Sequence, residues 1–154
     1  MRLELSKALK NPGQPMPFEL SEQFEPINVA GEELRFTKPV TVSGKATYTG
    51  EDFFLTGSIH AEYIATCCRC LKDVPSTMEI VFTEEYAKQA DENHPDRYLY
   101  QGETIELGQM AGDLISLNAP MRHLCSEDCQ GLCPVCGVDR NKTKCDCPQG
   151  DRQG

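Results

Sequence analysis

The sequence predicts an α+β protein: a mostly antiparallel β-sheet or partial barrel with one or two helices, followed by a cysteine-rich tail that binds zinc. Three observations support this fold class. Apolar and polar residues alternate in successive runs between residues 34 and 86, a later stretch has helical spacing, and six of the nine cysteines follow residue 124. We therefore divide the chain into a β-rich domain over residues 1–120 and a tail over residues 121–154.

The first third of the chain carries the weakest pattern. Leu3 and Leu5 alternate with polar residues and indicate a short strand. Three prolines and a glycine between residues 12 and 17 indicate turns. Phe18 and Leu20 then begin another extended segment.

The clearest strands follow. Residues 40–48 and 55–63 alternate apolar and polar side chains, and residues 50–52, Gly-Glu-Asp, have the composition of a hairpin turn. A third strand is predicted over residues 76–86. The Cys-x-x-Cys segment at residues 67–70 lies between the second and third strands, where it would form their turn.

A helix is predicted after an exposed loop. Residues 87–97 have no apolar period, and residues 98–105 have the pattern of a short strand. Apolar residues then recur at steps of three, one, three and one, which predicts an amphipathic helix near residues 107–118. Pro120 marks the end of this helix.

Charge and hydropathy indicate where the protein is located and which partners suit it. No segment approaches the roughly 18 apolar residues of a membrane span, and the N-terminus lacks a secretory signal, so we expect a soluble, cytoplasmic protein. Formal net charge is −9, and residues 61–110 hold four Lys or Arg against ten Asp or Glu. Such a surface favours basic protein partners, although acidic groups that only maintain solubility are an equal alternative.

Eight cysteines divide into two sets of four metal ligands. Cytosolic thiols stay reduced, so closely spaced pairs there indicate metal binding before disulfides. Site A takes Cys67, Cys70, Cys125 and Cys129, and would dock the tail onto the 67–70 turn. Site B takes Cys133, Cys136, Cys145 and Cys147, and is local to the tail. Cys68 is left over, because adjacent residues near a strand end point to opposite sides.

The expected cofactor is structural zinc, two ions in all. Four cysteines complete a tetrahedral shell and leave no position for substrate or water, and no motif for nucleophilic, phosphate or dinucleotide chemistry is present, so we expect no enzyme. The alternatives are a redox-active Cys67–Cys70 pair and, less favoured, an iron–sulfur cluster. His123 could replace a cysteine ligand, but a surface histidine is the preferred interpretation.

The ordered motifs resemble one family. They are a C-x-R-C-L turn from Cys67 to Leu71, an I-E-L helix entry, a helix ending in N-A-P, and the string C-S-E-D-C-Q-G-L-C-P-V-C-G from Cys125 to Gly137, closed by C-D-C. This set resembles the YceD family, the large ribosomal RNA subunit accumulation proteins of bacteria and plastids. Matching positions besides the eight cysteines are Arg69, Gly131 and Pro134. The additional Cys68 departs from the pattern, and Asp139 and Asn141 match an N-L-N-like string only loosely.

The resemblance implies a non-enzymatic role in large ribosomal subunit biogenesis and in accumulation of its RNA. The implied partner is a basic large-subunit ribosomal protein or a pre-ribosomal particle. A second hypothesis is a zinc-ribbon tail that binds RNA directly through four basic residues: Arg122, Arg140, Lys142 and Lys144. A third is a thiol redox-sensing module centred on Cys67 and Cys70.

Overall fold

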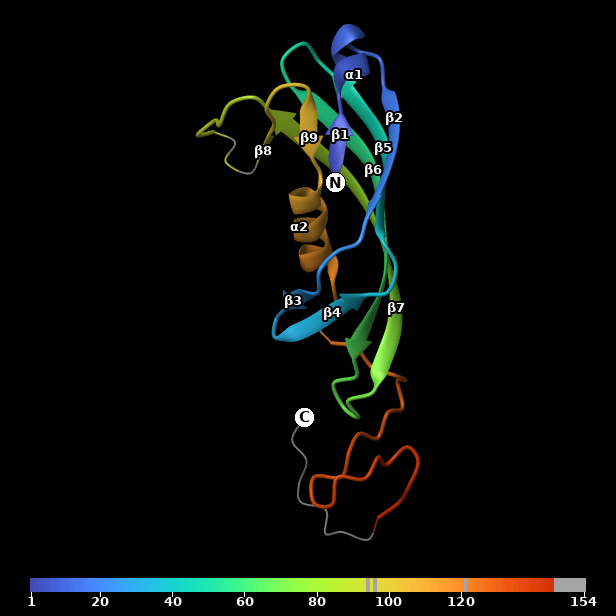
Figure 1. Cartoon of the computed structure of the whole chain (residues 1–154). Helices are drawn as coiled ribbons and strands as arrows, with labels where there is room; N and C mark the ends of the chain where they lie inside the picture. The colour runs from blue at the N-terminus through green and yellow to red at the C-terminus, as the bar shows by residue number, and fades with distance from the viewer. Residues whose placement is uncertain (94, 96, 121, 146–154) are drawn as a thin grey trace.

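The computed structural model describes residues 1–93, 95, 97–120 and 122–145 of the chain. Seven strands form one largely antiparallel sheet, two short strands form another, and two helices complete the described fold (Figure 1). In chain order the elements are β1 Arg2–Glu4, α1 Ser6–Lys10, β2 Met16–Glu22, β3 Ile27–Val29, β4 Glu32–Phe36, β5 Val40–Tyr48, β6 Phe53–Thr66, β7 Asp73–Ala87, β8 Tyr98–Leu99, β9 Thr104–Glu106 and α2 Gly108–Asn118.

The long β6–β7 hairpin dominates the sheet. Its antiparallel register is unbroken from Phe53 opposite Tyr86 to Thr66 opposite Asp73. On its other side β6 pairs with β5 and then with β4, so the strand order is β2-β5-β6-β4-β3 with β7 on the free side of β6. β8 extends β7 only at its end, in parallel. The hairpin therefore runs the length of the molecule and carries the Cys-x-x-Cys turn at one tip.

The core lies between one face of the sheet and α2. Alternate residues of β5, β6 and β7 are buried, as the two-residue period requires. α2 lies against this face (Figure 1) and buries Met110, Ala111 and Ile115. Phe53 and Leu55 of β6 are fully buried in the same cluster.

Several sequence predictions are confirmed and others need correction. The β5–β6 hairpin, β7 and α2 form where the patterns indicate. The strand expected over residues 98–105 is two separate strands, β8 and β9, because Gly102 takes a positive φ of 66° and turns the chain between them. α1 was not predicted, since five residues are too few for a helical period. Within the described residues the sheet does not close into a barrel.

Neither of the described helices has the length and apolar character needed to cross a membrane.

Candidate metal centre

Four cysteines from two distant stretches of chain meet at the tip of the β6–β7 hairpin. The sulfur atoms of Cys67, Cys70, Cys125 and Cys129 all lie within 4.8 Å of one another. The first two stand in the turn, where the N–H of Cys67 donates to the carbonyl of Lys72 at 2.8 Å. The other two come from the tail, which Figure 1 shows beyond this end of the sheet. The structure thus brings together the four residues of site A.

The spacing of these sulfurs suits a tetrahedral metal ion. Sγ of Cys67 lies 3.7 Å from Sγ of Cys129, and Sγ of Cys70 lies 3.5 Å from Sγ of Cys125. Two sulfurs on one tetrahedral zinc ion, with bonds of about 2.3 Å, are about 3.8 Å apart. A disulfide would bring two sulfurs to about 2.05 Å. The group can therefore hold a thiophilic metal ion.

The surroundings of site A favour thiolates at some positions and not at others. Burial raises the pKa of Cys67, but backbone N–H groups, first that of Cys70, outweigh it and lower this pKa to about 6. The side-chain amide of Asn141 lowers the pKa of Cys129 against the effect of burial. A backbone N–H from Lys72 lowers the pKa of Cys70, yet burial and the neighbouring thiols together raise it to about 12. Four adjacent thiolates need a cation among them to be stable.

Two hydrogen bonds to main-chain carbonyls hold the tail against the turn. The guanidinium of Arg69 donates to the carbonyl of Cys129 at 3.1 Å, and the N–H of Leu132 donates to the carbonyl of Arg69 at 3.3 Å. Gly131 has a φ of 76°, and a Cβ there would lie 3.2 Å from the Arg69 carbonyl oxygen. A glycine is therefore required for this close approach. These contacts give Arg69 and Gly131 a positioning role that sequence reasoning did not assign.

His123 is buried, and the surface interpretation of it was wrong. Its side chain is among the buried residues at 6% exposure. Nε2 lies 2.9 Å from the hydroxyl of Tyr63 on β6, and Nδ1 lies 3.1 Å from a carboxylate oxygen of Glu32 on β4. Its carbonyl accepts from the N–H of Cys68 at 2.9 Å. His123 therefore connects the start of the tail to β4 and β6, which no pattern in the sequence indicated.

Site B is described in part. The ligand atoms of Cys133, Cys136 and Cys145 lie within 4.8 Å of one another, whereas Cys147 lies outside the described residues. Backbone N–H groups of Cys136 and Val135 lower the pKa of Cys133 to about 5. Gly137 closes this turn with a φ of 78°. Three convergent thiols of this kind can hold a metal ion.

The loop between Cys136 and Cys145 connects the two cysteine groups. Nδ2 of Asn141 donates to Sγ of Cys129 at 3.3 Å, and its Oδ1 accepts from the N–H of Gln130 at 2.8 Å. Asp139 accepts from the Asn141 backbone at 3.0 Å and pairs with Lys72 of the hairpin turn at 2.9 Å. The loop of site B thus supplies hydrogen bonds to a ligand of site A. The loose match to the N-L-N-like string was the only sequence signal for it.

The remaining candidate residues are not among the grouped cysteines. Cys68 is exposed and belongs to neither group. Arg122, Lys142 and Lys144 are exposed, while Arg140 is half-buried. Three of the four basic tail residues are thus accessible to a ligand.

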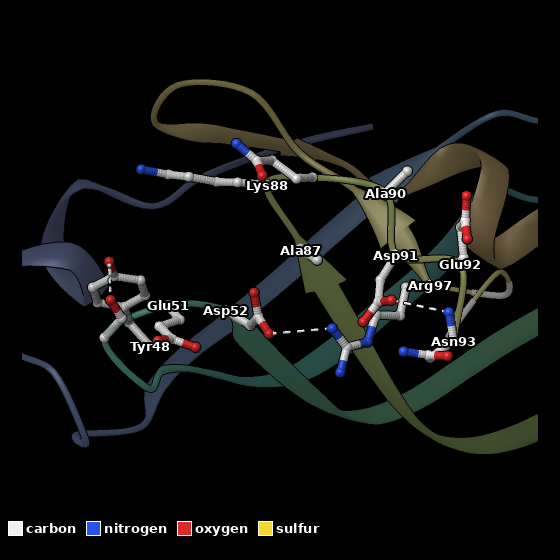
Figure 2. A pocket seen from close by; sticks show the side chains of 12 residues that line it. Tyr48, Glu51, Asp52, Ala87, Lys88, Ala90, Asp91, Glu92, Asn93 and Arg97 are labelled. Carbon is white, nitrogen blue, oxygen red and sulfur yellow. Dashed lines mark hydrogen bonds and ion pairs between the residues drawn. The ribbon is translucent and has the colours of Figure 1, made fainter.

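A hollow of about 650 Å³ lies at the opposite end of the sheet, beside the β5–β6 turn. Figure 2 shows its side chains, with Asp52 paired to Arg97 at 3.6 Å. Arg97 also pairs with Glu85 at 3.1 Å. The described lining residues include neither cysteine nor histidine, so the hollow is unrelated to the metal groups.

A family model matches the greater part of the chain. This model, described as large ribosomal RNA subunit accumulation protein YceD, matches residues 55–153. This segment contains β6 from Leu55 onward, β7, α2 and the tail as far as residue 153. No solved structure matches the chain significantly.

Three relatives illustrate the range of similarity. An uncharacterized protein of Mycobacterium tuberculosis is 34% identical over 95 residues, which cover 57% of this chain and 45% of the relative. The Bacillus subtilis protein YlbN is 27% identical over 131 residues, covering 83% of this chain and 76% of the relative. A chloroplastic Arabidopsis thaliana protein, large ribosomal RNA subunit accumulation protein YCED homolog 1, is 33% identical over 48 residues, 31% of this chain and 15% of the relative. The chain spans about half the length of the mycobacterial relatives it matches.

Proposed function

Because the chain belongs to the YceD family of large ribosomal RNA subunit accumulation proteins, we propose that it is a non-enzymatic, cytoplasmic factor in large ribosomal subunit biogenesis. Two structural zinc ions would fix its tail to the β-rich domain. The observation that carries this proposal is the convergence of Cys67 and Cys70 with Cys125 and Cys129 inside the segment that matches the family.

Zinc is the metal that suits these donors best. Four thiolates without an oxygen ligand favour soft or borderline ions, and a closed shell of four leaves no site for a reacting water. The two ligand sets are Cys67, Cys70, Cys125 and Cys129, and Cys133, Cys136, Cys145 and Cys147. The metal would have a structural role, holding the tail in its fold, since the tail has no helix or strand of its own within the described residues.

The proposed partner is a basic large-subunit ribosomal protein or a precursor particle. Residues 61–110 carry six more acidic than basic side chains, by ten against four, and this segment includes the exposed face of β7. Complementary charge accelerates and orients association with a basic surface.

Metal content is tested by native mass spectrometry of the purified chain. We expect two zinc masses in the wild type. Cys129→Ser should lose one of them, whereas Cys68→Ser, which changes an exposed cysteine outside both groups, should keep both. Zinc loss from both variants or neither would contradict the assignment of site A.

Partner binding is tested by affinity purification from bacterial lysate at low and high salt. Large-subunit ribosomal proteins or precursor RNA should be recovered at low salt and released at high salt. A low-salt eluate without them would refute the biogenesis role. Thiol titration under native conditions addresses the redox alternative, because metal-bound thiolates react slowly whereas a free Cys67–Cys70 pair reacts at once.

Direct RNA binding by the tail is a second candidate, supported by the exposure of Arg122, Lys142 and Lys144. A gel shift with large-subunit RNA fragments separates it from protein binding. If the tail binds RNA, Lys142→Glu with Lys144→Glu should abolish the shift. An unchanged shift would exclude this surface.

A further inference from the structure

In the described part of the chain, the outer edge of β7 has no partner strand over most of its length. β7 pairs with β6 from Asp73, opposite Thr66, to Tyr86, opposite Phe53. On the other side of β7 only Tyr86 and Ala87 are paired, and their partner is β8. Among the described residues, no strand pairs with residues 73–84 on this outer edge. An open edge of this length is uncommon, because free N–H and C=O groups invite another strand.

The hydrogen-bonding direction of each β7 residue follows from its register. The carbonyl of Glu62 accepts from the N–H of Thr37 at 3.0 Å, on the β4 side of β6. The main chain of Glu62 therefore points away from β7. Its cross-strand partner Thr77 then belongs to a pair without hydrogen bonds, and its own N–H and C=O point outward.

The same direction recurs at every second residue, because the register has no bulge. Four residues thus present main-chain donors and acceptors that no described strand pairs with: Thr77, Glu79, Val81 and Thr83. All four are exposed, and Val81 is 87% exposed although it is apolar. Pro75 has the same outward direction, where a missing N–H disturbs no bond to β6.

The charge of β7 indicates what would bind there. The strand DVPSTMEIVFTEEYA has four carboxylates and neither Lys nor Arg. Glu79 contacts His60 of β6 but keeps 62% of its side chain exposed. A second copy of this chain would bring like charges together across the edge, whereas an extended cationic segment would bring opposite charges together.

We propose that the outer edge of β7 binds an extended, lysine- or arginine-rich segment of a protein partner by strand addition. Main-chain bonds to Thr77, Glu79, Val81 and Thr83 would provide affinity, and the carboxylates would select cationic side chains. The inference deepens the proposed function, on which the choice of a basic partner rests, by locating where that partner binds.

The test uses the full zinc-loaded chain and a synthetic nine-residue peptide of alternating lysine and valine. Fluorescence polarisation measures binding to wild type, Val81→Pro and the control Val81→Thr. Proline removes the outward N–H at residue 81 and obstructs the edge, while bonds to β6 stay intact as they do at Pro75. We expect binding to weaken at least about tenfold for V81P and by less than about twofold for V81T.

Two further measurements make the result decisive even if V81P fails to fold. Residue-resolved amide exchange on the wild type should show that the peptide protects Thr77, Glu79, Val81 and Thr83. The amides between them should change little, since β6 already protects them. A peptide with alternate N-methylated amides should bind at least about tenfold more weakly.

Equal binding of the N-methylated peptide, or protection elsewhere, would overturn the proposal, as would a dimer through this edge in sedimentation experiments. The affinity purification is an independent result. Peptide binding at β7 without any ribosomal partner would refute the proposed function and leave the strand-addition site standing. If V81P recovers ribosomal partners as well as the wild type does, the proposed function stands and the strand-addition site is refuted.

Discussion

The strongest prediction about the metal centre concerns Asn141, because this residue belongs to the loop of site B and yet donates a hydrogen bond to a ligand of site A. Its Nδ2 lies 3.3 Å from Sγ of Cys129, and the same amide lowers the pKa of that thiol. Asn141→Ala removes both the hydrogen-bond donor to Cys129 and the acceptor for the Gln130 N–H, but it leaves all eight cysteines in place. Loss of one outer hydrogen bond to a metal ligand typically weakens metal affinity by about 10–100-fold.

We expect that range for site A and little change at site B. Competition with a chromophoric chelator gives the affinity of each site, once Cys129→Ser has identified which step belongs to site A. Lys142→Ala is the matched control, since Lys142 is the exposed neighbour of Asn141. Asn141→Asp should weaken site A further, because it places a negative charge beside a thiolate. Equal affinities for N141A and K142A would refute the outer-shell role of Asn141.

Three other predictions concern stability and pH. Gly44→Ala would place a Cβ 2.0 Å from a carbonyl oxygen of β6, so the free energy of unfolding measured in urea should fall by about 3 kcal/mol. Gly112→Ala has free space in α2, so the same quantity should rise by about 1 kcal/mol. Similar effects of the two substitutions would contradict the close approach at Gly44. His123→Ala removes the imidazole partner of the buried Tyr63 hydroxyl and one of the partners of the half-buried Glu32 carboxylate, so it should cost roughly 1–3 kcal/mol, with faster zinc release from site A alone. The pKa values of Cys67 and Cys133 are lowered from 9.0 to about 6 and about 5. Their contribution to stability is therefore complete above pH 9 and is lost as pH falls through 6 and then 5. Because protons compete with zinc for these thiolates, a zinc indicator should report an affinity that falls with pH over the same range; an affinity independent of pH there would contradict this.

The sequence by itself determined the strands of the β5–β6–β7 region and α2, because each has one buried face and therefore a strict period. It also determined the grouping of site A. The ligand types and the spacing within each Cys pair are local, and the structure places all four sulfurs within 4.8 Å. Membership of the family followed from the same local strings.

Only the tertiary structure decided how distant residues cooperate around that group. In the sequence His123 has no feature that distinguishes it from an ordinary polar residue. In the structure, β4 and β6 bring Glu32 and Tyr63 to its two ring nitrogens. Asn141 likewise acquires its role from a fold of the tail that places it against Cys129. The free edge of β7 depends on which strands lie beside it. Periodicity encodes which face of an element is buried, but pairing and long-range contacts depend on the whole chain, so a local pattern cannot reveal them.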